Sequence, residues 1–129
     1  MDRLIVLDAS VAIAALASDD AHHAAAATAL VGLGDSQLVI AATTRAEILV
    51  GPSRAGGAAL AAARDFVDGC ETVPVTAAIA DDAAALRSRH RAVSLPDAIA
   101  LVVANMIDAD AVWTFDRRWS GVDSRVVIP

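Results

Sequence analysis

Hydrophobic and polar positions follow two patterns along this chain. Short continuous runs of branched apolar residues, such as Leu4-Ile-Val-Leu7, are typical of strands that are buried on both faces of a parallel sheet. Longer segments with apolar residues at every third or fourth position are typical of helices. The first pattern predicts strands over residues 4–7, 37–41, 72–75, 111–115 and 125–128. The second predicts helices over residues 11–16, 21–33, 44–50, 53–68, 76–91 and 96–107.

The order of these elements predicts the class of fold. Strands alternate with helices throughout, which is typical of an α/β sandwich around a mainly parallel five-stranded sheet. Gly51 and Pro52 predict a break between the helices over 44–50 and 53–68. We expect a single domain over residues 1–129, a length that can bury a sizeable core without a disulfide or a structural metal.

Four acidic residues lie where the predicted strands end. Asp8 directly follows the first strand, and Asp116 follows the fourth. Glu47 lies one turn into the helix after the second strand, and Asp97 opens the most apolar helix. Ligands of open parallel sheets bind beyond the carboxyl ends of the strands, so we expect these four side chains to converge.

Such a convergence of carboxylates predicts a metal site. Crowded carboxylates raise one another's pKa values unless a cation lies among them. Mg²⁺, or Mn²⁺ in its place, prefers oxygen ligands of this kind. The ion lowers the pKa of a bound water and neutralises charge on a phosphate, which is the chemistry of phosphodiester hydrolysis.

Each acid also has a purely structural interpretation. Thr44-Arg-Ala-Glu47 and Ser94-Leu-Pro-Asp97 both fit the Ser/Thr-x-x-acid capping box, in which the acid only satisfies backbone N–H groups at a helix start. Asp116 alone is typical of a turn residue. The acid after the first strand is different, because a carboxylate that follows four buried aliphatic residues is costly unless it is paired or bound to metal.

Composition narrows the chemistry further. The chain has 32 alanines, ten arginines and no lysine, which favours helices and excludes a catalytic lysine. Its formal net charge of −6 argues against a nucleic-acid partner, unless part of that charge belongs to a metal site. The single cysteine, Cys70, cannot form an internal disulfide and is expected to be a packing residue.

Three other classes of protein also begin with an apolar strand like residues 4–7. Receiver-like signalling domains and haloacid-dehalogenase-like phosphatases need a lysine in the site, and the phosphatases need a second Asp where Ser10 stands. A dinucleotide-binding domain needs glycines after the first strand, and Asp8-Ala-Ser-Val-Ala-Ile has none. No apolar segment reaches the ~18 residues of a membrane span, so we expect a cytoplasmic protein.

Four segments together resemble the PIN-domain ribonucleases, and specifically the VapC toxins of bacterial VapBC toxin–antitoxin pairs. The segments are Leu4-Ile-Val-Leu-Asp8-Ala-Ser10, Thr44-Arg-Ala-Glu47-Ile, Leu95-Pro-Asp97-Ala-Ile-Ala and Trp113-Thr-Phe-Asp116-Arg. The resemblance implies a PIN-domain-like α/β/α sandwich with Asp8 and Asp97 as the core Mg²⁺ ligands. It implies that Glu47 and Asp116 complete the acidic cluster, through a second ion or through water.

The same resemblance implies further contacts and partners. Ser10 and Thr114 match small hydroxyl residues that contact the metal ligands or a phosphate, whereas Phe115 stands where many members have a polar residue. The implied substrate is tRNA or rRNA, and the implied partners are a second copy of the chain and a cognate VapB-type antitoxin. Two alternatives stay open, namely an RNA-processing PIN nuclease without an antitoxin and a non-catalytic interaction module.

The densest basic stretch lies at the end of the helix over 76–91. Arg87 and Arg91 are four residues apart with His90 between them, so one helix face could hold RNA phosphates beside the acids. The alternative is that they only complement the negative end of the helix. His22 and His23 are expected to be solvated, because neither has a cysteine or carboxylate at ligand spacing.

Overall fold

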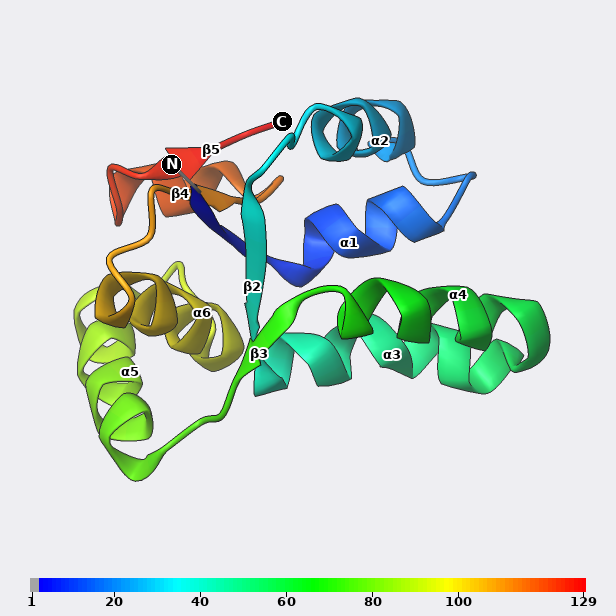
Figure 1. Ribbon diagram of the computed structural model, residues 1–129. Helices are drawn as coiled ribbons and strands as arrows, with labels where there is room; N and C mark the ends of the chain where they lie inside the picture. The colour runs from blue at the N-terminus through cyan, green and yellow to red at the C-terminus, as the bar shows by residue number, and fades with distance from the viewer. Residues whose placement is uncertain (1–2) are drawn as a thin grey trace.

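A parallel sheet forms the centre of the fold. The computed structural model describes residues 3–129 (Figure 1). In that range the strands are β1 (Leu4–Leu7), β2 (Gln37–Ala41), β3 (Glu71–Val73), β4 (Ala111–Trp113) and β5 (Val126–Val127). They pair in the order β3-β2-β1-β4-β5, and every pair is parallel. The predicted α/β class and five-stranded sheet are therefore confirmed, and β1, which precedes Asp8, is the central strand.

Helices cover both faces of the sheet. They are α1 (Ala9–Leu16), α2 (His23–Val31), α3 (Ala42–Ala55), α4 (Gly57–Asp68), α5 (Ala77–Arg89) and α6 (Leu95–Met106). A short 3₁₀ helix, η1 (Arg117–Gly121), follows β4 and was not predicted. Figure 1 shows α5 and α6 on one side of the central strands and α1, α3 and α4 on the other. None of the helices within residues 3–129 is long and apolar enough to cross a bilayer.

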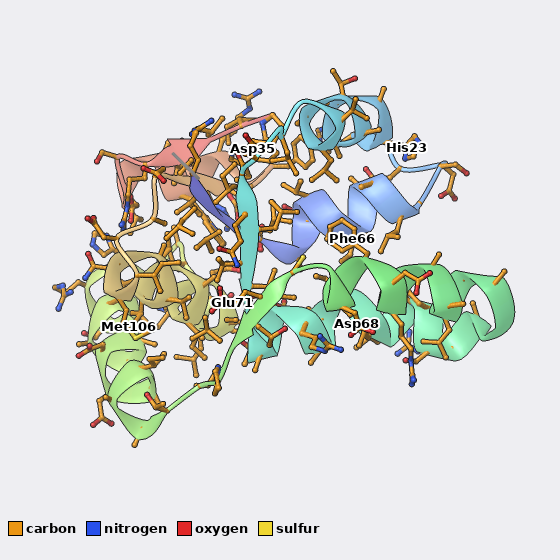
Figure 2. The ribbon with its side chains drawn as sticks, in the orientation of Figure 1. His23, Asp35, Phe66, Asp68, Glu71 and Met106 are labelled. Carbon is orange, nitrogen blue, oxygen red and sulfur yellow. The ribbon has the colours of Figure 1, made fainter. Side chains whose placement is uncertain are left out.

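The central strand contributes to two separate cores, one on each face. Ile5 and Leu7 pack against the helices α1 to α4, whereas Val6 packs against α5 and α6. All three side chains are fully buried. Side chains fill the space between the sheet and both helical layers (Figure 2). A continuous apolar run is therefore required in β1, because neither of its faces meets water.

The predicted break at Gly51 and Pro52 is wrong. Helix α3 continues through both residues, and the chain turns at Gly56 before α4 begins. Gly56 has φ of +66° and Gly57 has φ of +55°, a region that glycine adopts without the steric cost of a side chain. Proline removes one helical hydrogen bond, but it does not supply the positive φ that the turn requires. The longer α3 still carries Glu47 near its start.

Candidate active site

Asp8 is the most enclosed of the four predicted acids. Its side chain is only 9% exposed at the end of β1, and its backbone N–H donates to the Trp113 carbonyl (2.9 Å). Its Oδ2 accepts hydrogen bonds from the Ser10 hydroxyl (2.8 Å) and the Thr114 hydroxyl (2.7 Å). Thr114 is itself fully buried. Two hydroxyl donors, one in the first turn of α1 and one directly after β4, therefore fix the orientation of this carboxylate.

The same two hydroxyls bind the segment that follows β4. The backbone N–H of Phe115 donates to Ser10 Oγ (3.1 Å), and the backbone N–H of Asp116 donates to Thr114 Oγ1 (3.0 Å). Each hydroxyl thus donates to Asp8 and accepts from the β4 loop. This bonding explains why β4 ends at Trp113, two residues earlier than predicted, because the next residues turn toward the site.

Three of the acids act on one another electrostatically. Burial raises the pKa of Asp8, the two hydroxyl hydrogen bonds lower that pKa, and the charge of Asp97 raises it again. Partial burial also raises the pKa of Glu47, and the charges of Asp8 and Asp97 raise it further. Like charges raise carboxyl pKa values only where they lie near each other. Asp8, Glu47 and Asp97 therefore lie near enough for their charges to act on one another.

The two proposed capping boxes have different outcomes. Ser94 and Asp97 form one, since Ser94 Oγ accepts from the Asp97 N–H and Asp97 Oδ2 accepts from the Ser94 N–H, both at 3.3 Å. The Thr44–Glu47 box is absent, because α3 begins at Ala42 and Thr44 is buried inside its first turn. Asp97 thus combines a cap with a place in the acidic cluster, whereas Glu47 has no capping role.

Asp116 is held by a neighbouring arginine. Its Oδ1 accepts from the Arg118 backbone N–H (3.0 Å), which caps η1. The Arg118 guanidinium also binds both carboxylate oxygens, through Nε at 2.9 Å and Nη2 at 2.6 Å. This pairing holds the pKa of Asp116 below its usual range, and the charge of Asp97 acts on Arg118 as well. Sequence reasoning missed Arg118, although an Asp-x-Arg spacing after a strand allows such a pair.

The four predicted acids fit a hard divalent cation by their chemistry, although their side chains are not arranged as a complete coordination shell. All four candidates offer carboxylate oxygens, and the mutual charge of three of them raises pKa values that a cation would lower. Across residues 3–129, no three Asp, Glu, His or Cys side chains stand at mutual ligand spacing. Two of the acids have local partners instead: Asp97 accepts from its Ser94 cap, and Asp116 pairs with Arg118.

The basic stretch at the end of α5 is only partly helical. α5 ends at Arg89, and His90 leaves the helix with φ of −131° and ψ of 88°. The expectation that Arg87, His90 and Arg91 share one helix face is therefore wrong, because Arg91 lies beyond the helix end. Arg87 and Arg89 remain in the last turn, where they complement the helix dipole.

Both histidines near α2 have partners, but only His23 is half-buried; His22 is exposed, so the expectation of a solvated side chain is confirmed for His22 and wrong for His23. The His22 ring stacks on Phe115, with ring centroids 4.3 Å apart and ring planes 11° apart. His23 Nδ1 lies 2.8 Å from the Ala14 carbonyl oxygen. By contrast, Cys70 is the predicted packing residue: it is buried, burial raises its thiol pKa to about 11, and its Sγ donates to a backbone carbonyl.

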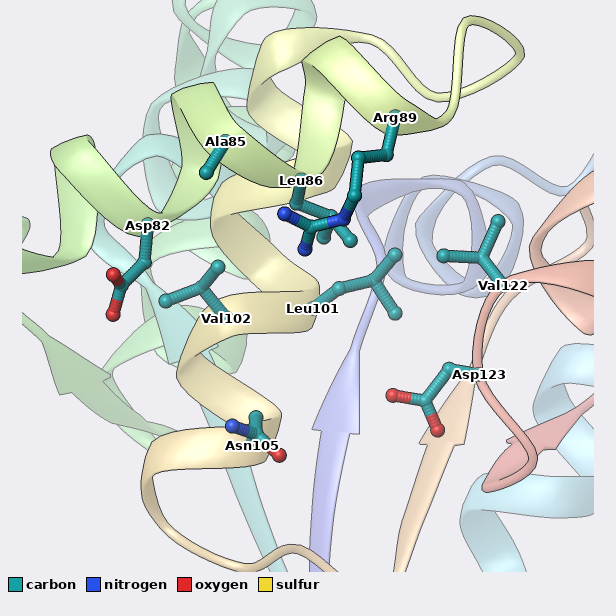
Figure 3. Close-up of a pocket in the computed structure, with 9 residues that line it drawn as sticks. All are labelled: Asp82, Ala85, Leu86, Arg89, Leu101, Val102, Asn105, Val122 and Asp123. Atoms are coloured by element: carbon teal, nitrogen blue, oxygen red, sulfur yellow. The ribbon is translucent and has the colours of Figure 1, made fainter.

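A cavity of about 380 Å³ lies away from these acids, between α5, α6 and the segment after η1. Figure 3 shows Arg89 and Leu86 of α5 above Leu101 of α6, with Asp123 on the segment after η1. Asp123 is already paired with Arg125 at 2.7 Å. None of the four predicted acids lines this cavity, so its shape does not mark the candidate active site.

The fold is a parallel α/β domain with a buried carboxylate at the end of its central strand. Two further carboxylates lie near it, and together they define a class of proteins with an acidic site at the sheet edge. The PIN domain family matches residues 5–124, and the chain belongs to that family. The match covers all six α-helices and four of the five strands, with β5 beyond its end, so the resemblance found in the four sequence segments is confirmed at the level of the family.

Several solved structures share this fold. A toxin–antitoxin complex from Klebsiella pneumoniae is 25% identical, with a TM-score of 0.80 and 97% of each chain covered. VapC20 of Mycobacterium tuberculosis, described as a toxin that cleaves the sarcin–ricin loop, is 22% identical, with a TM-score of 0.79 over 91% of this chain and 93% of that one. FitAcB from Neisseria gonorrhoeae is 20% identical, with a TM-score of 0.70 and 97% of each chain covered. A comparison with curated proteins found no match.

Proposed function

We propose that this PIN domain is the toxin of a toxin–antitoxin pair and that it is a divalent-metal-dependent endoribonuclease. The observation that carries the proposal is the Asp8 site, a buried carboxylate that two hydroxyls hold, whose pKa is raised by burial and further by the charge of Asp97. A buried charge of this kind is costly in isolation and is favoured by a bound cation. The similar structure from Klebsiella pneumoniae, a toxin–antitoxin complex, supports the biological setting, for which we propose the cytoplasm.

Asp8 and Asp97 are the proposed core ligands of Mg²⁺, which Mn²⁺ can replace. Glu47 and Asp116 would complete the cluster through a second ion or through water. When bound, the ion supplies an activated water and neutralises phosphate charge. Ser10 and Thr114 keep the central carboxylate oriented, and their hydrogen bonds favour its ionised form.

RNA is the proposed substrate, either tRNA or rRNA. The similarity to a toxin that cleaves the sarcin–ricin loop supports this class of substrate. Arg87, His90 and Arg91 remain proposed phosphate contacts, now as a helix end and the turn after it. Because these contacts would be ionic, each phosphate that they neutralise should make RNA binding weaker as salt rises.

An apolar groove supports the proposed antitoxin partner. It encloses about 280 Å³ and is lined by α1, α3 and the start of α4. Ile13 of α1 is 40% exposed there, facing Ile48 and Pro52 of α3 across the groove. An amphipathic helix presents apolar side chains that would fill such a groove. We propose that a VapB-type antitoxin covers it, and that two copies of the chain form a homodimer.

Cleavage of RNA by the purified chain tests the catalytic proposal. The wild type should cut total cellular RNA or tRNA in Mg²⁺ or Mn²⁺ and lose activity in EDTA. Asp8→Asn should lose at least 100-fold in rate while its circular dichroism spectrum stays native. Full activity of folded Asp8→Asn, or full activity of the wild type in EDTA, would overturn the assignment.

Binding of the neighbouring gene product tests the partner. If that product is the antitoxin, Ile13→Arg should abolish the complex in size-exclusion chromatography and keep RNA cleavage. Val31→Arg is the matched control, because Val31 is 88% exposed and lies outside the groove. Cleavage without any partner would instead favour an RNA-processing PIN nuclease, and chromatography with light scattering would report whether the chain is a dimer.

A further inference from the structure

Aromatic side chains are scarce in this chain, and one of them stands beside the acidic site. The sequence has two tryptophans, two phenylalanines and no tyrosine. Trp113 and Trp119 are buried, and Phe66 of α4 packs against the core on the α1–α4 side of the sheet. Phe115 also touches that core, but it lies between the residue that binds Asp8 and the residue that binds Arg118.

Phe115 and His22 form a stacked pair whose backbone is anchored on both sides. Their ring centroids are 4.3 Å apart, and the ring planes differ by 11°. The Phe115 N–H donates to Ser10 Oγ, and the His22 N–H donates to Asp20 Oδ1 (2.8 Å). His22 is exposed, whereas Phe115 is half-buried. The imidazole therefore offers an aromatic face to solvent over a half-buried phenyl ring.

The stack is connected directly to the proposed reaction centre. Ser10 Oγ, which accepts from the Phe115 N–H, donates to Asp8 Oδ2 (2.8 Å). Two hydrogen bonds therefore separate the Phe115 backbone from the central carboxylate. A nucleotide next to a phosphate at Asp8 would have its base within reach of this stack.

We propose that the His22–Phe115 stack is a nucleobase-binding platform, on which an unpaired RNA base stacks next to the phosphodiester that is cut. The platform rests on the proposed RNA substrate. Stacking on aromatic side chains is the usual way in which proteins bind unpaired bases, and it accepts any base because each has a π face. A stacked base contributes a factor of about 5 to 150 in affinity.

Because the chain is acidic, a contact that does not depend on charge would contribute to its affinity for RNA. With a formal net charge of −6 and no lysine, the protein attracts the RNA backbone less than a basic nuclease does. Stacking depends little on net charge, so it can supply affinity where phosphate contacts are few. The platform would also select for unpaired regions of RNA, because a base inside a duplex cannot reach it.

Two RNA probes of equal charge test the proposal. One is a fluorescent mixed-sequence single-stranded 12-mer, and the other has the same ribose–phosphate chain with every base replaced by hydrogen. Fluorescence anisotropy in Ca²⁺, with RNA integrity checked on a gel, gives the ratio of the two affinities. We expect the wild type to favour the base-containing probe by about 5- to 150-fold.

Variants separate stacking from packing. His22→Ala should bring the affinity ratio close to one, and Phe115→Leu should lower it in the same direction. His22→Phe should keep the ratio, because it keeps the stack. Phe66→Leu is the matched control for lost aromatic packing and should leave the ratio unchanged. Circular dichroism verifies that each variant is folded.

The outcomes are distinct from those of the nuclease proposal. A wild-type ratio near one, or an unchanged ratio in folded His22→Ala, would overturn the platform even if the protein cuts RNA. If His22→Ala weakens only the binding of a protein partner, the platform is equally overturned. A ratio that depends on His22 in a protein that cuts no RNA would keep the platform and overturn the nuclease.

Discussion

Thr114→Val is a sharp test of how the site holds its central carboxylate. The substitution keeps the shape of a fully buried side chain but removes its hydroxyl. Two hydrogen bonds are lost, the one donated to Asp8 Oδ2 at 2.7 Å and the one accepted from the Asp116 N–H at 3.0 Å. The change therefore affects the orientation of Asp8 with little effect on packing volume.

The expected magnitude follows from these two bonds. A hydrogen bond to a charged carboxylate contributes about 1.5–3 kcal/mol, and the neutral one about 1 kcal/mol. The free energy of unfolding should fall by about 2–4 kcal/mol, which corresponds to a decrease in Tm of about 7–15 °C for a domain of this length. Thr114→Ser keeps the hydroxyl and should lose much less.

Urea and thermal denaturation in EDTA measure this loss, and its pH dependence identifies the cause. The Thr114 hydrogen bond lowers the pKa of Asp8, so it stabilises the ionised form. The stability difference between wild type and variant should be full above the pKa of Asp8 in the folded variant, which is higher than in the wild type because the hydrogen bond is gone. It should shrink as pH falls and the carboxyl becomes protonated.

A control substitution in the same protein should change stability in the opposite direction. The Thr43 hydroxyl is buried without a hydrogen-bond partner among the described residues, so Thr43→Val should raise stability by about 1–3 kcal/mol. If Thr114→Val is as stable as the wild type at pH 8, or if its loss does not depend on pH, the hydrogen-bonded carboxylate is not the feature that organises this site.

Two further predictions concern the charge of the site and the α3–α4 turn. Because burial raises the pKa of Asp8, its ionised form destabilises the metal-free fold. Asp8→Asn should therefore raise Tm at pH 7 in EDTA, and this difference should vanish below about pH 3.8. The same substitution should abolish the Tm increase that Mg²⁺ gives the wild type. Gly56→Ala should lower the free energy of unfolding by about 1–3 kcal/mol in chemical denaturation, because the φ of Gly56 is +66°. Gly51→Ala, inside α3 with open space around it, should raise the free energy of unfolding by about 0.5–1 kcal/mol. Equal effects at both glycines would contradict this account of the turn.

Much of the fold was predictable because local patterns and global packing agree. The run Leu4–Leu7 is apolar on both faces because two cores meet on β1, and Asp8 is conspicuous because it ends that run. The Ser94–Asp97 cap was also recognisable, since a capping box depends only on local spacing. Those features need no knowledge of distant contacts.

The remaining features depend on contacts between distant parts of the chain. The start of α3 at Ala42 removes the cap expected at Thr44, because the helix begins directly where β2 ends. Phe115 meets His22 only when the loop after β4 and the loop before α2 are brought together by the fold, which no periodicity in the sequence reveals. Arg118 was missed for a different reason, since an exposed Asp–Arg pair has no hydrophobic pattern.

The chemical nature of the RNA ends tests the central claim most directly. If the Asp8 cluster directs water at phosphorus with metal assistance, mass spectrometry of the cleaved RNA should find 3′-hydroxyl and 5′-phosphate ends. Those ends should be absent when Asp8→Asn replaces the wild type or when EDTA is present. Products with 2′,3′-cyclic phosphate and 5′-hydroxyl ends, formed by attack of the RNA's own 2′-hydroxyl, would contradict the account.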